Sequence, residues 1–347
     1  MSVICVDPRT DPLWETLVTQ RQSSVFHSPA WIQVLAETYD WKAQAYVILN
    51  DAGEPEAGLP FFQIADARGE RIVSLPFSDY CDPLVATADQ WNTLLDGLLV
   101  EHVPITVRCL HNSIPLADSR FLLVDRAKWH GLDLRPDIDT HWRKLDSSAR
   151  RAIQKAQRDG VEIRVAQDVD ELRVFYQMHL GIRKHKYHLL AQPYRFFENI
   201  WHQFMDQGFG LLMLAVYQDL IIGGVLFLEW QDTLVYKFNA SNPNFLAHRP
   251  TDLLIWEAIH YGKSKGYDYL DFGLSDWDQD GLIRFKRKFA TEEKTISFLR
   301  YPTYRPPNLQ QKHFQSLLPQ LTDLFTDASV SDAVTEKAGD LLYRFFG

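Results

Sequence analysis

The sequence is poor in cysteine, since its 347 residues include only Cys5, Cys81 and Cys109. Their spacing forms no CxxC pair, which argues against a zinc site or a disulfide framework and favours a reducing compartment. The chain also lacks long apolar runs, because the longest, at 220–230, is too short to cross a bilayer. The N-terminal residues lack the basic and apolar regions of a signal peptide, so we expect a cytoplasmic protein without a transmembrane segment.

Positive charge is not in excess, since 36 Lys and Arg residues face 45 Asp and Glu residues. The formal net charge of −9 argues against a protein that coats nucleic acid over its whole surface, but it allows a local basic patch. Aromatic residues are plentiful, with 10 Trp, 14 Tyr and 21 Phe, enough for large cores or ring-lined grooves. The length of the chain predicts two domains.

The second half of the chain alternates strands and helices in a clear order. We expect strands at 161–167, 210–218, 220–230, 233–241, 267–273 and 295–301, and helices at 141–159, 168–184, 193–207, 252–265 and 281–289. Short polar joins between the three strands from 210 to 241 are typical of an antiparallel meander.

The first half repeats this order with one element missing. Where the second half has the helix 281–289, the first half has only the short polar segment 111–119. A repeat of this length indicates two copies of one domain rather than a solenoid. We therefore predict an α/β (α+β) fold with domains at 1–140 and 141–301, each a mixed, largely antiparallel sheet flanked by helices. The remainder, 302–347, opens with a Pro-rich stretch and continues as a helical tail.

Residues 271–289, DFGLSDWDQDGLIRFKRKF, begin with the DFG tripeptide of protein kinases. A kinase also needs a Gly-rich phosphate loop, a lysine on its third strand and an HRD loop, and none of these precedes the tripeptide. We interpret DFG as the end of a strand, with Gly273 at a turn.

The next residues have the spacing of a calcium loop, with Asp276, Asp278 and Asp280 at its first three ligand positions. The twelfth position should be a bidentate Glu but is Arg287, a cation. We therefore expect no metal there, and we interpret the segment as an acidic loop whose Asp280 caps the following helix.

The helix 281–289 carries an apolar stripe and several cations. A cationic helix face is usually just solvated. Two of its residues are nevertheless site candidates, Lys286 as a catalytic residue and Arg284 as a substrate-binding residue. A fixed ammonium at Lys286 could hold the phosphate or ribose end of a donor, or stabilise the oxyanion formed when an amine attacks a carbonyl.

The predicted helix 141–159 forms a second basic patch. Arg151 and Lys155 share one of its faces, where they could grip a diphosphate or an RNA backbone. The alternative is an ordinary helix between two domains, with solvated cations.

A third cluster, Arg183, Lys184 and His185, follows the helix 168–184 and could line a groove for an acceptor, with His185 as a base. Such clusters more often lie on the surface. In the first domain, Asp79 and Tyr80 follow the strand near residue 75 and could contact the acceptor, although the adjacent proline also favours a simple turn.

The order of the elements resembles the GNAT acyltransferase fold, and two copies in tandem are similar to the Fem family and its BioF2-like relatives. The matching motifs are R-x-x-I-x-K-A-x-x-x-G ending at Gly160, the run 253–273, G-L-x-x-F-K-x-x-F at 281–289, and the N-terminal HSPAWIQVL and LPFSDYCDP. The resemblance implies transfer of amino acids to peptidoglycan precursors. It also implies that Lys286 lies at the acyl-transfer site and that Arg151 or Lys155 contacts the nucleotide diphosphate of the acceptor.

One loop departs from the pattern of CoA-binding GNAT domains. These domains usually hold the pyrophosphate with a Gly-containing loop at a helix N-terminus, but the loop 241–252 has no glycine. His248, Arg249 and Thr251 remain as candidate phosphate contacts. At the ends of the neighbouring strands, Asn239 and Asp271 are candidates for the acyl-transfer step.

Three functions are therefore compatible with the sequence. The first is an N-acyltransferase that moves an aminoacyl or acyl group onto an amine of a nucleotide- or lipid-linked envelope precursor, with no tightly bound cofactor. Its donor is aminoacyl-tRNA or acyl-CoA, and peripheral membrane association is compatible with such an acceptor. The second is a CoA-dependent acyltransferase that modifies a polysaccharide or lipid. The third is a binding module that retains the fold without catalysis.

Overall fold

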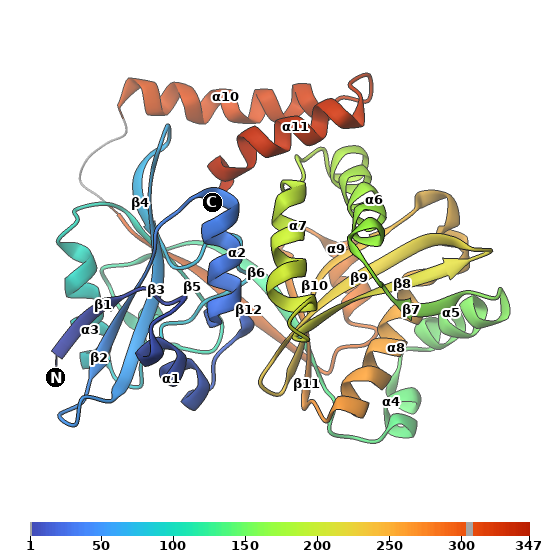
Figure 1. Cartoon of the computed structure of the whole chain (residues 1–347), viewed down its shortest axis with the longest axis horizontal. Coiled ribbons are helices and arrows are strands. Elements are labelled where there is room, and N and C mark those ends of the chain that lie inside the picture. The colour runs from blue at the N-terminus through green and yellow to red at the C-terminus, as the bar shows by residue number, and fades with distance from the viewer. Residues whose placement is uncertain (1, 303–307) are drawn as a thin grey trace. The chain divides into compact units, whose positions relative to one another are not determined.

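The computed structural model describes residues 2–302 and 308–347 (Figure 1). Most of the Pro-rich stretch that opens the predicted tail lies outside these residues. Close contacts divide the chain into unit 1, which comprises 1–127, 295–321 and 344–347, and unit 2, which comprises 128–294 and 322–343. Two strands, β6 (Leu122–Asp133) and β12 (Glu292–Tyr301), each contribute residues to both units. The domain boundaries expected from the sequence, 1–140 and 141–301, remain a prediction.

The part of unit 1 before β6 holds five further strands and three α-helices among its described residues. The strands are β1 (Ser2–Val6), β2 (Ala43–Leu49), β3 (Pro55–Asp66), β4 (Gly69–Val73) and β5 (Ile105–Cys109), and the helices are α1 (Pro12–Gln20), α2 (Pro29–Tyr39) and α3 (Ala88–Leu99). The strand order is β1-β2-β3-β4-β5-β12, with antiparallel pairs except for the parallel pair β4–β5. Between β5 and β6 lies only the 3-10 helix Pro115–Ala117, so the helix expected to be missing from the first copy is indeed missing.

Unit 2 repeats this arrangement. Its further strands are β7 (Glu162–Val165), β8 (Gly210–Tyr217), β9 (Leu220–Trp230), β10 (Thr233–Ser241) and β11 (Tyr269–Asp276), in the order β6-β11-β10-β9-β8-β7. Its helices are α4 (Ile138–Lys144), α5 (Ser147–Arg158), α6 (Val169–Tyr187), α7 (Tyr194–Ile200), α8 (Pro250–Lys265) and α9 (Asp280–Lys286). Strands β8 to β10 form the predicted antiparallel meander, and β7 pairs antiparallel with β8. Two further helices, α10 (Leu309–Thr326) and α11 (Asp332–Leu342), follow β12.

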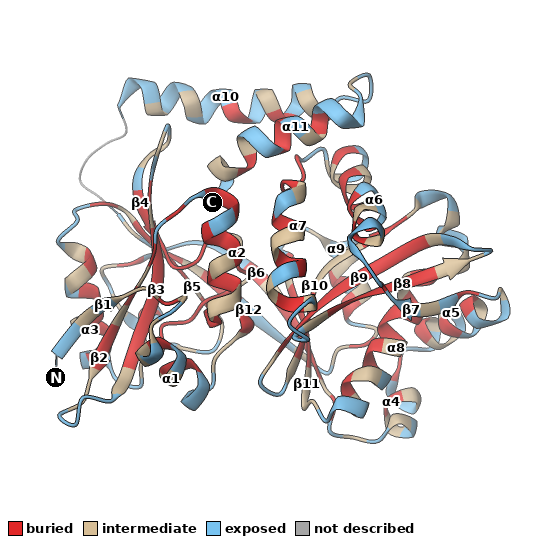
Figure 2. Ribbon diagram, viewed as in Figure 1, coloured by how far each residue is buried: buried red, intermediate tan, exposed pale blue. Residues whose placement is uncertain are grey.

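Helices cover both faces of the unit 2 sheet, and two neighbouring glycines show how. A side chain at Gly223 would contact Pro250 of α8, whereas one at Gly224 would contact Phe175 of α6. Successive residues of a strand point to opposite faces, so α8 and α6 lie on opposite sides of β9. Figure 2 shows the result, with β8 and β9 buried along most of their lengths. Both faces being covered explains why these strands are almost entirely apolar.

The parallel pair β10–β11 separates after a short contact. Only Thr233, Leu234 and Val235 of β10 pair with residues of β11, and the last pair is Val235 with Asp271. Beyond this point β10 continues to pair with β9 as far as Ser241. The diverging ends of β10 and β11 therefore leave the sheet open between them. We call this region the splay.

Two local predictions are wrong. The basic helix 141–159 is two helices, because Asp146 interrupts it and caps α5 by accepting a hydrogen bond from Ser148 N at 2.7 Å. An Asp followed by two serines favours a helix start over a helix interior. Asp280 is not the cap of α9 either. It is the first helical residue, and Gln279 occupies the cap position.

One buried carboxylate ties β9 to α8 and β11. Glu229 accepts hydrogen bonds from the hydroxyls of Tyr261 and Tyr267, both at 2.6 Å. Burial and the Glu229 carboxylate raise the pKa of both tyrosines. In the folded protein they therefore keep their protons at a pH where unfolded tyrosines, with a pKa of about 10, have lost theirs.

The free energy of unfolding is therefore expected to fall as the pH rises above about 10, because the unfolded state then binds fewer protons than the folded state. Urea denaturation at pH 8 and at pH 11 measures this fall. Glu229→Leu removes one cause of the raised pKa values and should make the fall smaller. An equal fall in the variant would contradict the role given to Glu229.

Candidate functional site

The bend at the start of the splay is made by the DFG residues. Gly273 has a φ of +64°, in the left-handed region that favours glycine. Its N–H donates to Asp271 Oδ1 at 2.6 Å, and the same oxygen accepts from Trp129 Nε1 at 2.7 Å. Asp271 is only 2% exposed. The carboxylate thus holds the strand in its bent path, and DFG is a strand end with Gly273 at a bend, as expected.

Lys286 lies at the same bend. Its side chain is 2% exposed, and Nζ donates to Gly273 O at 3.1 Å and to Leu274 O at 2.7 Å. A buried ammonium is stable only when its hydrogen bonds are made, and the bent strand supplies two carbonyl acceptors. The structure therefore fixes a positive charge at the carboxyl end of β11.

Two polar side chains further along the splay have buried atoms without a hydrogen-bond partner. These atoms are Asn239 Oδ1 on β10 and Ser275 Oγ on β11. Each residue lies four positions beyond the last pair, Val235 with Asp271, on strands that no longer pair with each other. Buried polar atoms in native structures usually have partners, so the two diverging strand ends retain hydrogen-bonding capacity for a bound molecule.

A charged cluster around Glu293 adjoins Lys286 along the chain. Glu293 accepts from Lys128 Nζ at 2.7 Å and from Arg287 Nε at 2.7 Å, and these cations lower its pKa to about 2. Its other neighbour is His130 Nε2, at 3.1 Å. The His130 side chain is fully buried, and its Nδ1 has no hydrogen-bond partner. Burial, followed by the charge of Lys286, lowers the pKa of His130.

The N-terminus of α8, where a GNAT domain would hold a pyrophosphate, carries an acid. Asp252 lies in the first turn, 6% exposed, with Lys288 Nζ at 3.4 Å, and burial raises its pKa. Thr251 Oγ1 is 3.0 Å from Ser241 Oγ, and Arg249 is the cap residue. A carboxylate in the first turn competes with an incoming anion for the positive end of the helix.

Two further phosphate candidates, Lys155 and His248, share one acidic partner. Asp159 accepts from Lys155 Nζ at 2.6 Å and lies 2.8 Å from His248 Nδ1. Arg151 and Arg284 are exposed on α5 and α9. The basic face of α5 is therefore partly neutralised by its own Asp159.

The cluster expected after the helix lies in the last turns of α6 instead, because α6 continues to Tyr187, and it faces the C-terminal helices. Lys184 is 1% exposed, and its Nζ donates to Val330 O and to Asp332 Oδ1. His185 Nε2 lies 3.6 Å from the same carboxylate, and Arg183 Nε donates to Leu190 O at 3.1 Å. Lys184 therefore fastens the end of α6 to the start of α11.

The candidates of the first copy lie in unit 1. Tyr80 is 6% exposed and packs edge-on against Phe26 and His111. Asp79 beside it is half-buried. Both follow β4, as predicted.

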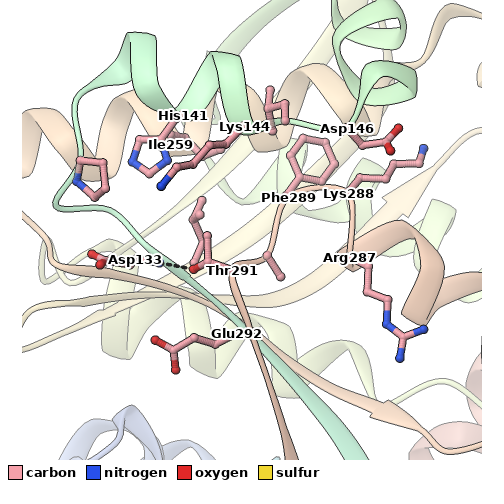
Figure 3. A pocket seen from close by; sticks show the side chains of 14 residues that line it. Asp133, His141, Lys144, Asp146, Ile259, Arg287, Lys288, Phe289, Thr291 and Glu292 are labelled. Atoms are coloured by element: carbon pink, nitrogen blue, oxygen red, sulfur yellow. Dashed lines mark hydrogen bonds between the residues drawn. The ribbon is translucent and has the colours of Figure 1, made fainter.

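A pocket of about 470 Å³ lies in unit 2 between α4 and the segment that joins α9 to β12 (Figure 3). Its lining includes Lys144, Asp133 and Thr291, and Thr291 Oγ1 accepts from Asp133 N at 3.1 Å. Charges of both signs line it, so its composition favours no single class of ligand.

The structure thus brings Lys286 and Asp271 together at one bend and places Asn239 across the splay. It places the other candidates elsewhere. Sequence reasoning missed Trp129, His130 and Ser275. The first two lie in the second half of β6, which continues to Asp133, and Ser275 lies beyond the predicted end of the strand 267–273. In the described part of the chain, no group of three or more His, Cys, Asp or Glu residues could hold a metal, and no helix could span a membrane.

Residues 143–287 match the model of the acetyltransferase (GNAT) domain family. The matched residues all lie in unit 2. The matched segment includes the splay and Lys286, and no curated protein matches the sequence significantly.

Solved structures with the same fold cover both halves of the chain. FemX has a TM-score of 0.68 at 14% identity, over 91% of this chain and all of its own. L-PGS from Bacillus licheniformis has a TM-score of 0.56 at 14% identity, covering 91% and 98%. A tandem GNAT protein from the clavulanic acid biosynthesis pathway has a TM-score of 0.53 at 10% identity, covering 88% and 99%. The predicted fold, two GNAT-like copies as in Fem-like proteins, is confirmed.

Proposed function

We propose that the protein is an N-acyltransferase that moves an aminoacyl or acyl group from an activated donor to an amine of a cell-envelope precursor. The observation that carries this proposal is the splay of the GNAT domain, with the buried ammonium of Lys286 at its start and unpartnered polar atoms of Asn239 and Ser275 further along. The likeness to FemX and L-PGS supports the choice of an envelope acceptor.

The reaction is a direct transfer. The acceptor amine attacks the carbonyl carbon of the donor, and the carbonyl oxygen gains negative charge. The C–O or C–S bond to the leaving group then breaks, and the leaving oxygen or sulfur takes a proton from the attacking nitrogen. The fixed charge of Lys286 stabilises the oxyanion, since a preorganised charge in a buried site needs no reorganisation.

The donor we favour is an aminoacyl ester such as aminoacyl-tRNA rather than acyl-CoA. The loop before α8 has no glycine, and Asp252 occupies the first turn where a pyrophosphate would bind. Both features weaken the usual CoA site. The acceptor is a nucleotide- or lipid-linked precursor, which the exposed Arg151 and Arg284 would meet from α5 and α9. We place the reaction in the cytoplasm, where such precursors and tRNA are available.

Transfer assays with purified protein test this proposal. Labelled aminoacyl-tRNA and acyl-CoA are offered as donors, with UDP-linked muropeptides as acceptors, and melting temperatures are recorded with each compound. Binding at one hundred times Kd stabilises a protein by about 2.7 kcal/mol, so a true ligand should raise the melting temperature clearly. We expect the muropeptide to do so and the aminoacyl ester to support transfer.

Each other outcome points to a different function. Stabilisation and transfer by acyl-CoA alone would support the CoA-dependent alternative and overturn our choice of donor. If no donor or acceptor changes the melting temperature and none reacts, the protein is a binding module, and the proposed function is wrong.

A further inference from the structure

The buried side chain of His130 is not explained by the core around it. Apolar packing alone would not select a histidine, because one of its nitrogens, Nδ1, is buried without a hydrogen-bond partner. An unsatisfied buried acceptor destabilises the folded protein. A residue kept at such a cost deserves a functional explanation in a region that also holds Lys286.

The partner on the other ring nitrogen determines the tautomer. Glu293 is ionised, since its neighbours Arg287 and Lys128 lower its pKa to about 2. A carboxylate can only accept a hydrogen bond, so His130 Nε2 carries the proton and donates to it at 3.1 Å. In the neutral ring, Nδ1 therefore carries a lone pair.

The charge of Lys286 acts on His130 and lowers its pKa. His130 is on β6, the neighbour of β11 in the sheet, and Lys286 Nζ donates to the β11 carbonyls of Gly273 and Leu274. A lone pair beside a buried ammonium is favourable. A protonated ring there would add a second positive charge, which is strongly unfavourable in a medium of low dielectric constant.

We propose that His130 is a positioning residue for Lys286, acting as the neutral Nε2–H tautomer that Glu293 selects. Neutral His130 lets the ammonium rest on the two carbonyls of the bent strand. When His130 takes up a proton, repulsion moves the ammonium away from them, and the site loses its fixed charge. The site is thereby switched off at acidic pH.

The direction of the pH dependence follows from the charges that face His130. Lys286 and Arg287 lower its pKa and Glu293 raises it, with burial as the largest cause of the net decrease. Lys128 acts through its ion pair with Glu293. His130 therefore stays neutral at neutral pH and becomes protonated only below the ordinary histidine range.

NMR titration of the histidine imidazoles in the whole protein tests the coupling without any substrate. His130→Gln identifies the resonance among those of the 12 histidines. Lys286→Met should raise the pKa of His130 by about one unit, the scale of a nearby charge, and Glu293→Gln should lower it. Lys294→Met removes a cation from the neighbouring position and should leave it unchanged. An unchanged pKa in Lys286→Met would overturn the inference.

The effect on catalysis rests on the proposed function and is measured separately. In Glu293→Gln, the acidic limb of kcat/KM against pH should move to lower pH by the same amount as the NMR pKa of His130. If the NMR value moves and the limb does not, His130 has only a structural role and the inference is wrong. If no donor supports transfer, the proposed function fails instead, and the titration alone decides whether His130 and Lys286 are coupled.

Discussion

Replacing Lys286 with methionine is expected to lower the rate of acyl transfer by about two to three orders of magnitude, the usual effect of removing one preorganised donor to an oxyanion. Methionine is similar in length and lacks the charge. The decrease should be in kcat rather than KM, because the charge acts on an oxyanion that exists only in the transition state. Steady-state kinetics with the donor that supports transfer measure the change.

Folding must be separated from chemistry in this variant. Loss of Nζ leaves the carbonyls of Gly273 and Leu274 without that donor, at about 1–3 kcal/mol each. The variant also no longer buries a charge, which offsets part of this cost. Circular dichroism and the melting temperature show whether the variant is folded and how much stability it has lost. Lys265→Met, an exposed lysine at the end of α8, is the matched control and should transfer at the normal rate. Full activity of a folded Lys286→Met variant would remove Lys286 from the site.

Asp271 gives the second large effect, and its two substitutions should differ. Both hydrogen bonds, from Trp129 Nε1 and Gly273 N, end on the same oxygen, Oδ1. Asp271→Asn keeps one such oxygen, so the bend and the activity should survive within about tenfold. Asp271→Ala leaves two buried donors without their acceptor, at about 1–3 kcal/mol each.

Chemical denaturation and transfer rates measured side by side distinguish the two roles of Asp271. We expect the alanine variant to lose both stability and activity, because Gly273 no longer offers its carbonyl to Lys286 in the bent geometry. If the asparagine variant is stable but as inactive as the alanine variant, Asp271 is the general base of the reaction and not only the residue that holds the bend.

The sequence predicted the elements of the fold well where apolar periodicity was strong. The three strands β8, β9 and β10 were expected within one residue of their observed ends, because both faces of this meander are buried and its turns are polar. The second half of β6 was missed. Its residues 126–130, RAKWH, alternate between polar and apolar character, so this pattern could have predicted the longer strand.

The site was predictable only in part, for reasons of geometry. Lys286 and Asp271 were found through a motif, but their shared contact with Gly273 depends on a left-handed bend that no periodicity reports. The placement of Asn239 and Ser275 beyond the last β10–β11 pair depends on strand register, which is set by pairing across the sheet. The burial of Lys184 was not predictable, because its carbonyl and carboxylate partners lie almost 150 residues away in the chain.

The most direct test of acyl transfer at the splay is amide hydrogen exchange with and without a non-reactive analogue of the donor. We predict that the analogue slows exchange at 236–241 of β10 and 272–276 of β11, and that Lys286→Met weakens this protection. Protection confined to unit 1, with the two strand ends of unit 2 unchanged, would contradict the assignment of the site.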